Sequence, residues 1–100
     1  MDIIQTLKAI NNEKRLQILD WLKHPEDNFP PHTDVPGFEQ GVCVSNIQDK
    51  LGLSQSATSQ YMSILENADL VISTRIGKWT YYKRNEEAIA QFADYLKDNL

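Results

Sequence analysis

The sequence predicts a mainly α-helical domain with one β-hairpin, the architecture of a winged helix-turn-helix. Apolar residues recur at helical spacing over most of the chain, and two short helices meet at Gly52-Leu53-Ser54. After Leu70 the pattern changes to two strand-like runs separated by two residues. The chain has 100 residues, of which 41% are apolar and 24% charged, so we expect one globular domain over residues 1–100.

Two helices open the chain. Residues 2–10 place Ile3, Leu7 and Ile10 on one stripe, and Asn12 is the expected N-cap of the next helix, over about 13–23. That helix should end before Pro25, because proline disfavours helical backbone at the preceding residue. The start of the chain lacks the basic region and cleavage site of a signal peptide, and no apolar run approaches 18 residues.

A loop insertion is expected at about 25–42. All four prolines fall between residues 25 and 40, and sixteen residues is long for a connection in a compact domain. The segment carries Phe29, His32 and Phe38, which would suit contact with an effector or partner. We favour the simpler interpretation that it covers the edge of the core.

The central helix pair begins, on this pattern, with Ser45 as N-cap of a two-turn helix that Gly52 ends. Ser54 then caps a helix over about 55–67. The residues expected on its buried stripe are Ala57, Tyr61, Ile64, Leu65 and Ala68.

The hairpin and a last helix complete the chain. Gly77-Lys78 fits a type II′ turn, which needs glycine at its first position. Asn85 should cap the final helix, whose apolar stripe runs through Ile89, Phe92, Ala93, Leu96 and Leu100.

Short polar side chains gather on the exposed side of the 55–67 helix. They belong, with the capping serine, to the set Ser54, Gln55, Ser56, Thr58, Ser59, Gln60 and Ser63. An ordinary solvated helix face carries Glu, Lys and Arg, and helix propensity does not favour Ser or Thr. Glutamine can bond bidentately to adenine, and hydroxyls can donate to bases or phosphates. The set therefore predicts contact with DNA; a serine-rich capping region is the alternative.

Charge distribution supports a nucleic-acid surface in the middle of the chain. The net charge is −4, yet residues 45–84 hold five bases and three acids, a local balance of +2. Arg75, Lys78 and Trp79 are expected near the hairpin tip, where they would contact the DNA backbone. Lys83 and Arg84 lie at its far end and are expected to be merely solvated.

Three segments resemble the ArsR-type winged-helix repressors. Residues 9–19 (AINNEKRLQIL) are similar to that family's ALADPTRLRIL, residues 53–65 (LSQSATSQYMSIL) to its LSQSTVSHHLKVL, and residues 75–82 (RIGKWTYY) to its REGRWVYY. The resemblance implies a homodimeric transcriptional repressor that binds operator DNA and pairs through its first and last helices; the single cysteine, Cys43, indicates a cytoplasmic setting. The apolar stripes on those helices agree, and place Ile3, Leu7, Ile89, Phe92 and Leu96 in the dimer interface.

The metal sites of the family are broken here. Cys43 matches the first thiolate of the family's Cys-x-Cys motif, but Ser45 stands in place of the second, and a hydroxyl is a poor ligand for soft metals. Residues 85–100 contain no histidine for the family's other site, and His24 and His32 have no ligand spacing with Cys43. We therefore expect no metal and no cofactor. As the only cysteine, Cys43 excludes an internal disulfide and suggests a reducing compartment; we interpret it as a small buried hydrophobe, with redox sensing left open.

Two functions compete on this basis. The first is a dimeric, sequence-specific DNA-binding regulator, a repressor released by an unknown signal. The second is a protein-interaction module that uses the same fold without binding DNA; the acidic balance and the absence of Lys and Arg from the 55–67 helix favour it. We do not expect an enzyme, because no Gly-rich phosphate loop, ordered Ser/His/Asp set or paired apolar carboxylates occur.

Overall fold

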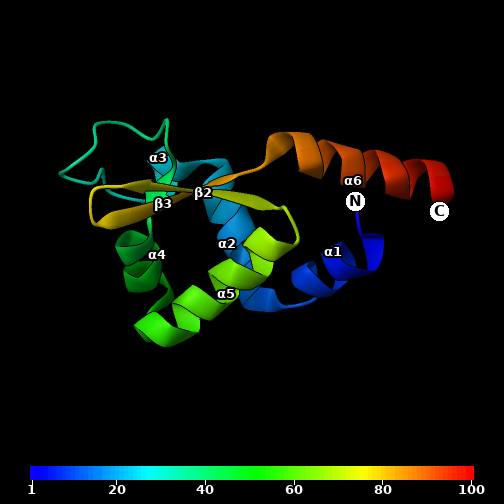
Figure 1. The fold of residues 1–100 in the computed structure, drawn as a ribbon, viewed down its shortest axis with the longest axis horizontal. Helices are drawn as coiled ribbons and strands as arrows, with labels where there is room; N and C mark the ends of the chain where they lie inside the picture. Colours follow the sequence, from blue (N-terminus) through cyan, green and yellow to red (C-terminus); the bar gives the residue numbers. More distant parts are fainter.

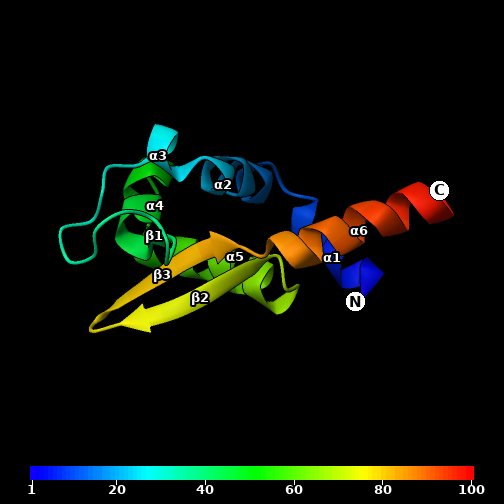
Figure 2. The ribbon, with the colours of Figure 1, turned by 90° about the horizontal axis from the view of Figure 1, so that it is seen from above.

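The computed structural model describes all residues, 1–100. Its elements, in order, are α1 (Ile3–Ile10), α2 (Glu13–Lys23), α3 (Pro25–Asn28), β1 (Val42–Cys43), α4 (Val44–Leu51), α5 (Gln55–Asn67), β2 (Val71–Ile76), β3 (Trp79–Arg84) and α6 (Glu86–Asn99). The molecule is elongated, 44 × 25 × 23 Å. The hairpin tip lies at one end and the C-terminal part of α6 projects from the other (Figures 1 and 2). None of the helices combines the length and apolar character that a bilayer crossing requires.

The predicted caps Asn12, Ser54 and Asn85 are confirmed. Their side chains accept hydrogen bonds from the N–H groups of Arg15, Ala57 and Ala88 at 3.0, 3.1 and 3.2 Å, respectively. A fourth cap, Asp2, accepts from the Gln5 N–H. Gly52 ends α4 in the left-handed conformation, as expected, with φ of 69°.

The expected cap at Ser45 is wrong. Helix α4 begins at Val44, and Cys43 occupies the N-cap position with extended backbone. The cause is the sheet: Cys43 pairs with Tyr81 in β3, so the backbone stays extended through residue 43 and turns helical immediately afterwards. Ser45 lies in the first helical turn, with its Oγ 3.2 Å from the Cys43 Sγ.

A three-stranded antiparallel sheet has the order β1-β3-β2. The β2–β3 hairpin closes between Ile76 and Trp79, which confirms the two-residue turn, and Gly77 has the positive φ of 60° that its first position requires. Strand β1 was not expected. It is two residues long, too short to leave a periodic signal in the sequence.

The insertion is shorter and more structured than predicted. Its first four residues form the single-turn helix α3, because proline is tolerated at a first helical position and Glu26 and Asp27 suit a first turn. Its end, Val42, belongs to β1. Residues 29–41, called the connecting loop below, join the two elements.

The buried face of α5 is rotated from the predicted stripe. Thr58, Met62 and Leu65 are completely buried, whereas Ala57, Tyr61 and Ile64 are only half-buried. Leu65 and Ala68 are buried as expected. Thr58 fits the core because its hydroxyl donates to the Ser54 carbonyl at 2.9 Å, so its polar atom is satisfied within the helix.

Gly41 is buried where the connecting loop meets the sheet, with φ of 100°. A Cβ there would clash with the Tyr82 carbonyl and lie 2.8 Å from the Lys83 nitrogen. Gly41→Ala should therefore lower the free energy of unfolding by roughly 2–5 kcal/mol, the combined cost of strained backbone and an overpacked contact.

Urea unfolding measures this cost, and Gly37→Ala is the matched control. Gly37 has φ of 69° but nothing within 4 Å of its added Cβ, so only a left-handed backbone cost of about 1–2 kcal/mol applies. Equal losses in the two variants would contradict the steric role of Gly41.

Candidate nucleic-acid interface

The exposed face of α5 consists of five side chains that carry no charge. Gln55, Ser59 and Ser63 follow one another at four-residue intervals, with Ser56 and Gln60 beside them, and all five are exposed. At this spacing they lie on one side of the helix. This surface, called the polar face below, contains five of the six residues predicted there.

Thr58 is the exception, and its prediction as a DNA contact is wrong. Its side chain is 0% exposed and its hydroxyl is already bonded to Ser54 within the helix. The periodicity of the serine-rich segment did not reveal this, because a threonine that bonds back to its own helix can replace an apolar residue in the core.

The N-terminal end of α5 opens beside the polar face. Ser54 is exposed and its Oγ takes the Ala57 N–H, while the N–H groups of Gln55 and Ser56 have no acceptor within the helix. Such N–H groups and the helix dipole favour an anion at this point.

The hairpin carries two exposed cations near its tip. Arg75 donates through Nε to the Gly77 carbonyl at 3.1 Å, which ties its side chain to the turn. Lys78 lies at the turn itself, with its Nζ 5.2 Å from the centre of the Trp79 ring. Both cations were predicted at this position.

Trp79 is not the free contact that the sequence suggested. Its side chain is half-buried, its ring meets the His32 ring edge-to-face at 5.0 Å, and its Nε1 is buried without a hydrogen-bond partner. The connecting loop, which sequence reasoning could not place, covers it. The Trp79 indole contacts Lys78 through the cation–π interaction described above.

Arg84 also departs from expectation. Its side chain is 13% exposed and forms a two-bond ion pair with Glu86 at 3.0 Å, which ties the end of β3 to the first turn of α6. Lys83 is exposed, as predicted.

The connecting loop is attached to both the sheet and the helix pair. The His32 Nδ1 lies 2.9 Å from the Tyr81 hydroxyl, and the Asn46 amide of α4 donates to the Pro30 carbonyl at 3.3 Å. Burial, with smaller contributions from Cys43 and Asp34, raises the pKa of Tyr81 above 10.0. The loop therefore supports the wing from one side; the sequence marked His32 as notable but gave no sign of its partner.

A second link joins the hairpin to α5. The Ser73 hydroxyl of β2 donates to Glu66 of α5 at 2.5 Å. Burial, and then the charge of Glu66, raise the pKa of the neighbouring Tyr82. This contact links the wing to α5, the helix that carries the polar face.

The five predicted interface residues differ in how far their own chain covers them. Leu7 is 40% exposed, and Ile3, Ile89 and Leu96 are half-buried. Phe92 is 9% exposed and lines an apolar groove of about 320 Å³ between α2 and α6, so its own protomer covers most of its side chain. Three further apolar side chains are exposed, namely Ile4 on α1, Tyr95 on α6 and Leu100 directly after α6.

The potential metal ligands that the sequence singled out, Cys43, His24 and His32, lie in different surroundings. Cys43 is completely buried, and His32 is engaged with Tyr81. His24 instead lies near Glu26 and Asp27 on the exposed surface of α3, so the structure does not bring Cys43, His24 and His32 together. Cys43 is the buried small side chain that the sequence predicted.

The α4–α5 pair, with the β2–β3 hairpin following it, makes the chain a winged helix-turn-helix protein (Figures 1 and 2). The family described as "Bacterial regulatory protein, arsR family" matches residues 38–73. This stretch contains β1, α4 and α5.

Similar proteins extend the match over the whole chain. An uncharacterised HTH-type transcriptional regulator of Bacillus subtilis, YbzH, is 53% identical over 100 residues, which is 100% of both chains. ArsR2 of Halobacterium salinarum, whose assignment as an arsenical resistance operon repressor is provisional, is 33% identical over 96% of this chain and 71% of its own. The chain therefore belongs to the ArsR family of bacterial regulatory proteins, and it is a transcriptional regulator.

Among solved structures, the homodimeric winged helix-turn-helix DNA-binding domain of Mb0332 from Mycobacterium bovis, a possible ArsR-family regulator, has the same fold. The TM-score is 0.66 at 25% identity, over 96% of this chain and 78% of that one. This agreement confirms the predicted fold class.

Tyr81 and Tyr82 should make the fold sensitive to alkali. Their raised pKa values mean that the folded state favours the neutral phenols, so their contribution is complete below the unfolded pKa of about 10 and is lost as the pH rises above it. Unfolding followed between pH 8 and 11 should show stability falling more steeply for the wild type than for Tyr81→Phe. Tyr95→Phe removes an exposed phenol and is the control; an equally shallow fall there would contradict the assignment.

Proposed function

We propose that this regulator is a dimeric repressor that recognises a specific DNA sequence by inserting α5 into the major groove. The observation that carries the proposal is the polar face, which is exposed, free of charge and rich in base-reading groups. The cations near the hairpin tip provide the backbone contacts that such a helix needs.

Each part of the surface has a distinct role in this proposal. Gln55 and Gln60 bond to base edges, and serines of the polar face donate to bases or phosphates. A phosphate lies at the N-terminal end of α5, beside Ser54 and Ser56. Arg75 and Lys78 contact the backbone, while Trp79 holds Lys78 in place.

Dimerisation would occur through α1 and α6. Exposed apolar side chains on both helices, including Ile4, Leu7 and Tyr95, need cover that their own chain does not supply. The homodimeric state of the M. bovis domain supports this arrangement. Two protomers would present two copies of α5 to two half-sites.

Repression, with release by a signal, is the regulatory mode that we propose. The provisional assignment of ArsR2 as an operon repressor supports it. We expect the signal not to be a metal, since Ser45 replaces the second thiolate of the family motif and Cys43 is buried. A second candidate, a protein-interaction module, is favoured by the absence of Lys and Arg from α5 and by the net charge of −4.

Two substitutions should separate base recognition from backbone contact. Gln60→Ala should cost roughly 1–3 kcal/mol of binding and relax the preferred sequence at one position. Lys78→Ala should weaken all sequences alike and reduce the salt slope by about 1 per protomer. Selection from random DNA followed by salt titration measures both, with Gln17→Ala, on an exposed position of α2, as the control.

The wild type is the reference for the choice between the two functions. Failure of the wild type to select any DNA would favour the interaction module. If the wild type selects DNA and a variant with Gln55, Gln60 and Lys78 all replaced by alanine still does so, the interface lies elsewhere.

Leu96→Asp tests the dimer. Position 96 is half-buried on α6, so a charge there would be desolvated in the interface and should yield a monomer by sedimentation at micromolar concentration. Asn99→Asp adds the same charge at an exposed position of α6 and should leave the dimer intact. A monomeric wild type would overturn the proposed interface. Phe92 is unsuited to this test, because it packs within its own protomer.

A further inference from the structure

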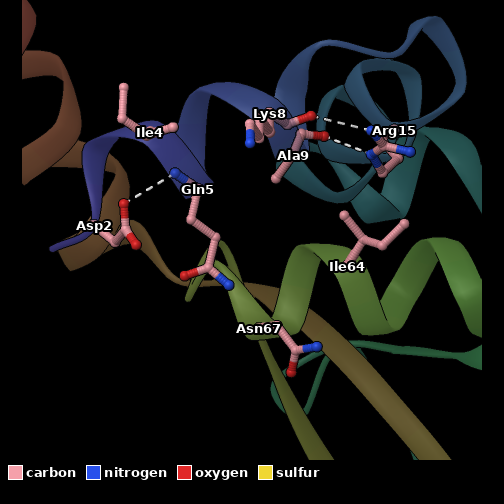
Figure 3. A pocket seen from close by; sticks show the side chains of 8 residues that line it. All are labelled: Asp2, Ile4, Gln5, Lys8, Ala9, Arg15, Ile64 and Asn67. Carbon is pink, nitrogen blue, oxygen red and sulfur yellow. Dashed lines mark hydrogen bonds between the residues drawn. The ribbon is translucent and has the colours of Figure 1, made fainter.

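The Arg15 side chain joins three helices. It lies in the first turn of α2, and its Nε and Nη2 donate to the carbonyls of Ala9 at 2.6 Å and Lys8 at 3.1 Å, at the end of α1 (Figure 3). On α5, the ring centre of Tyr61 lies 5.8 Å from the guanidinium carbon. One half-buried side chain thus contacts α1 and α5 from α2.

The contact with α1 needs the shape of a guanidinium. The last carbonyls of a helix have no partner within it, and Arg15 bonds to two of them with a single planar group; the Lys8 carbonyl also accepts from the Asn11 N–H at 3.3 Å. Its own N–H donates to Asn12, the cap of α2, at 3.0 Å. Arg15 therefore stabilises the junction between α1 and α2 with both its main chain, through Asn12, and its side chain, through the carbonyls of α1.

Arg15 matters for α5 because α1 and α5 are separated along part of their length. A hollow of about 630 Å³ lies between them, with Gln5 and Lys8 of α1 on one side and Ile64 and Asn67 of α5 on the other (Figure 3). The two helices also contact each other directly, and Ala9 of α1 is buried in the core, but the hollow leaves part of their facing surfaces unpacked. Arg15 lines the hollow, and its cation–π contact with Tyr61 connects α5 to the α1 carbonyls that Arg15 binds.

Tyr61 follows Gln60 of the polar face directly. A change in the Tyr61 contact would therefore rotate or shift the residues that read bases. On the side of α1, the same guanidinium holds the helix that we assign to the dimer. The Arg15 side chain therefore contacts the elements that carry both of these surfaces.

We propose that Arg15 is a positioning residue that sets the orientation of each α5 relative to α1, and through the dimer fixes the spacing between the two copies of α5. This inference rests on the proposed function of α5 and α1. Its consequence is that Arg15 contributes to recognition of half-site spacing without contacting DNA itself.

The test uses the full chain and operators that the wild type selects from random DNA. Arg15→Lys keeps the charge but cannot bond two carbonyls with one planar group, and Tyr61→Leu removes the ring beneath it. Each should weaken binding to the two-half-site operator by about tenfold and flatten the preference for its natural spacing over spacings changed by one base pair. Binding to a single half-site should change less than about twofold.

A double-mutant cycle separates positioning from a structural role. The Arg15→Lys/Tyr61→Leu double variant should bind the operator about as weakly as either single variant, because both changes break one connection. Tyr61→Phe keeps the ring and should behave as wild type. Dimer dissociation by sedimentation and unfolding in urea are measured for every variant, so that a general loss of stability is recognised.

The outcomes distinguish this inference from the proposed function. A wild type that binds no DNA would overturn the proposed function and this inference with it. Suppose instead that the wild type binds DNA, but Arg15→Lys and Tyr61→Leu keep its spacing preference or have additive effects. That result would overturn only the positioning role. If Arg15→Lys fails to fold, the comparison of Tyr61→Leu with Tyr61→Phe decides by the same spacing measurement.

Discussion

The pairing of two residues, Val42 and Cys43, with β3 is the constraint on which the reading end of the molecule depends. It ends the connecting loop at a fixed place, starts α4 at Val44 and holds the helix pair against the base of the hairpin. Gly41 permits it, because no side chain fits against the Tyr82 carbonyl there. The burial of Cys43 follows from the same pairing, so the family's thiolate position serves here as part of the sheet.

The connecting loop adds a layer of support that a bare hairpin lacks. His32 contacts both Tyr81 and Trp79, one at the sheet and one near the tip, while Glu66 holds β2 from the side of α5. A wing held from two sides loses less conformational entropy when it contacts a phosphate backbone. This gives the insertion a structural role that its proline-rich composition does not indicate.

Local sequence signals predicted most of the fold but only part of the candidate DNA-binding surface. The caps at Asn12, Ser54 and Asn85 and the Gly77 turn depend on residues close in sequence, so pattern reasoning found them. Predictions were wrong where a residue distant in sequence determines the local structure. Pairing with β3 shifts the start of α4 to Val44, and the connecting loop covers part of Trp79. The prediction for Thr58 was wrong for a different reason. Its hydroxyl donates to a carbonyl of its own helix, so this polar residue can be buried in the core. The role of Arg15 left no periodic signal at all.

Two contacts link α1 to the wing, one after the other, and both involve α5. Arg15 connects α1 to α5 at Tyr61, and Glu66, further along the same helix, connects α5 to β2. Helix α5 is thus the common element, linked near Tyr61 to α1 through Arg15 of α2 and near its C-terminal end to the wing through Glu66. In the proposed repressor, a signal that releases DNA must change the orientation of α5 relative to one of these neighbours. The hollow between α1 and α5 is a place where such a change meets little packing, since part of the facing surfaces of the two helices is unfilled there.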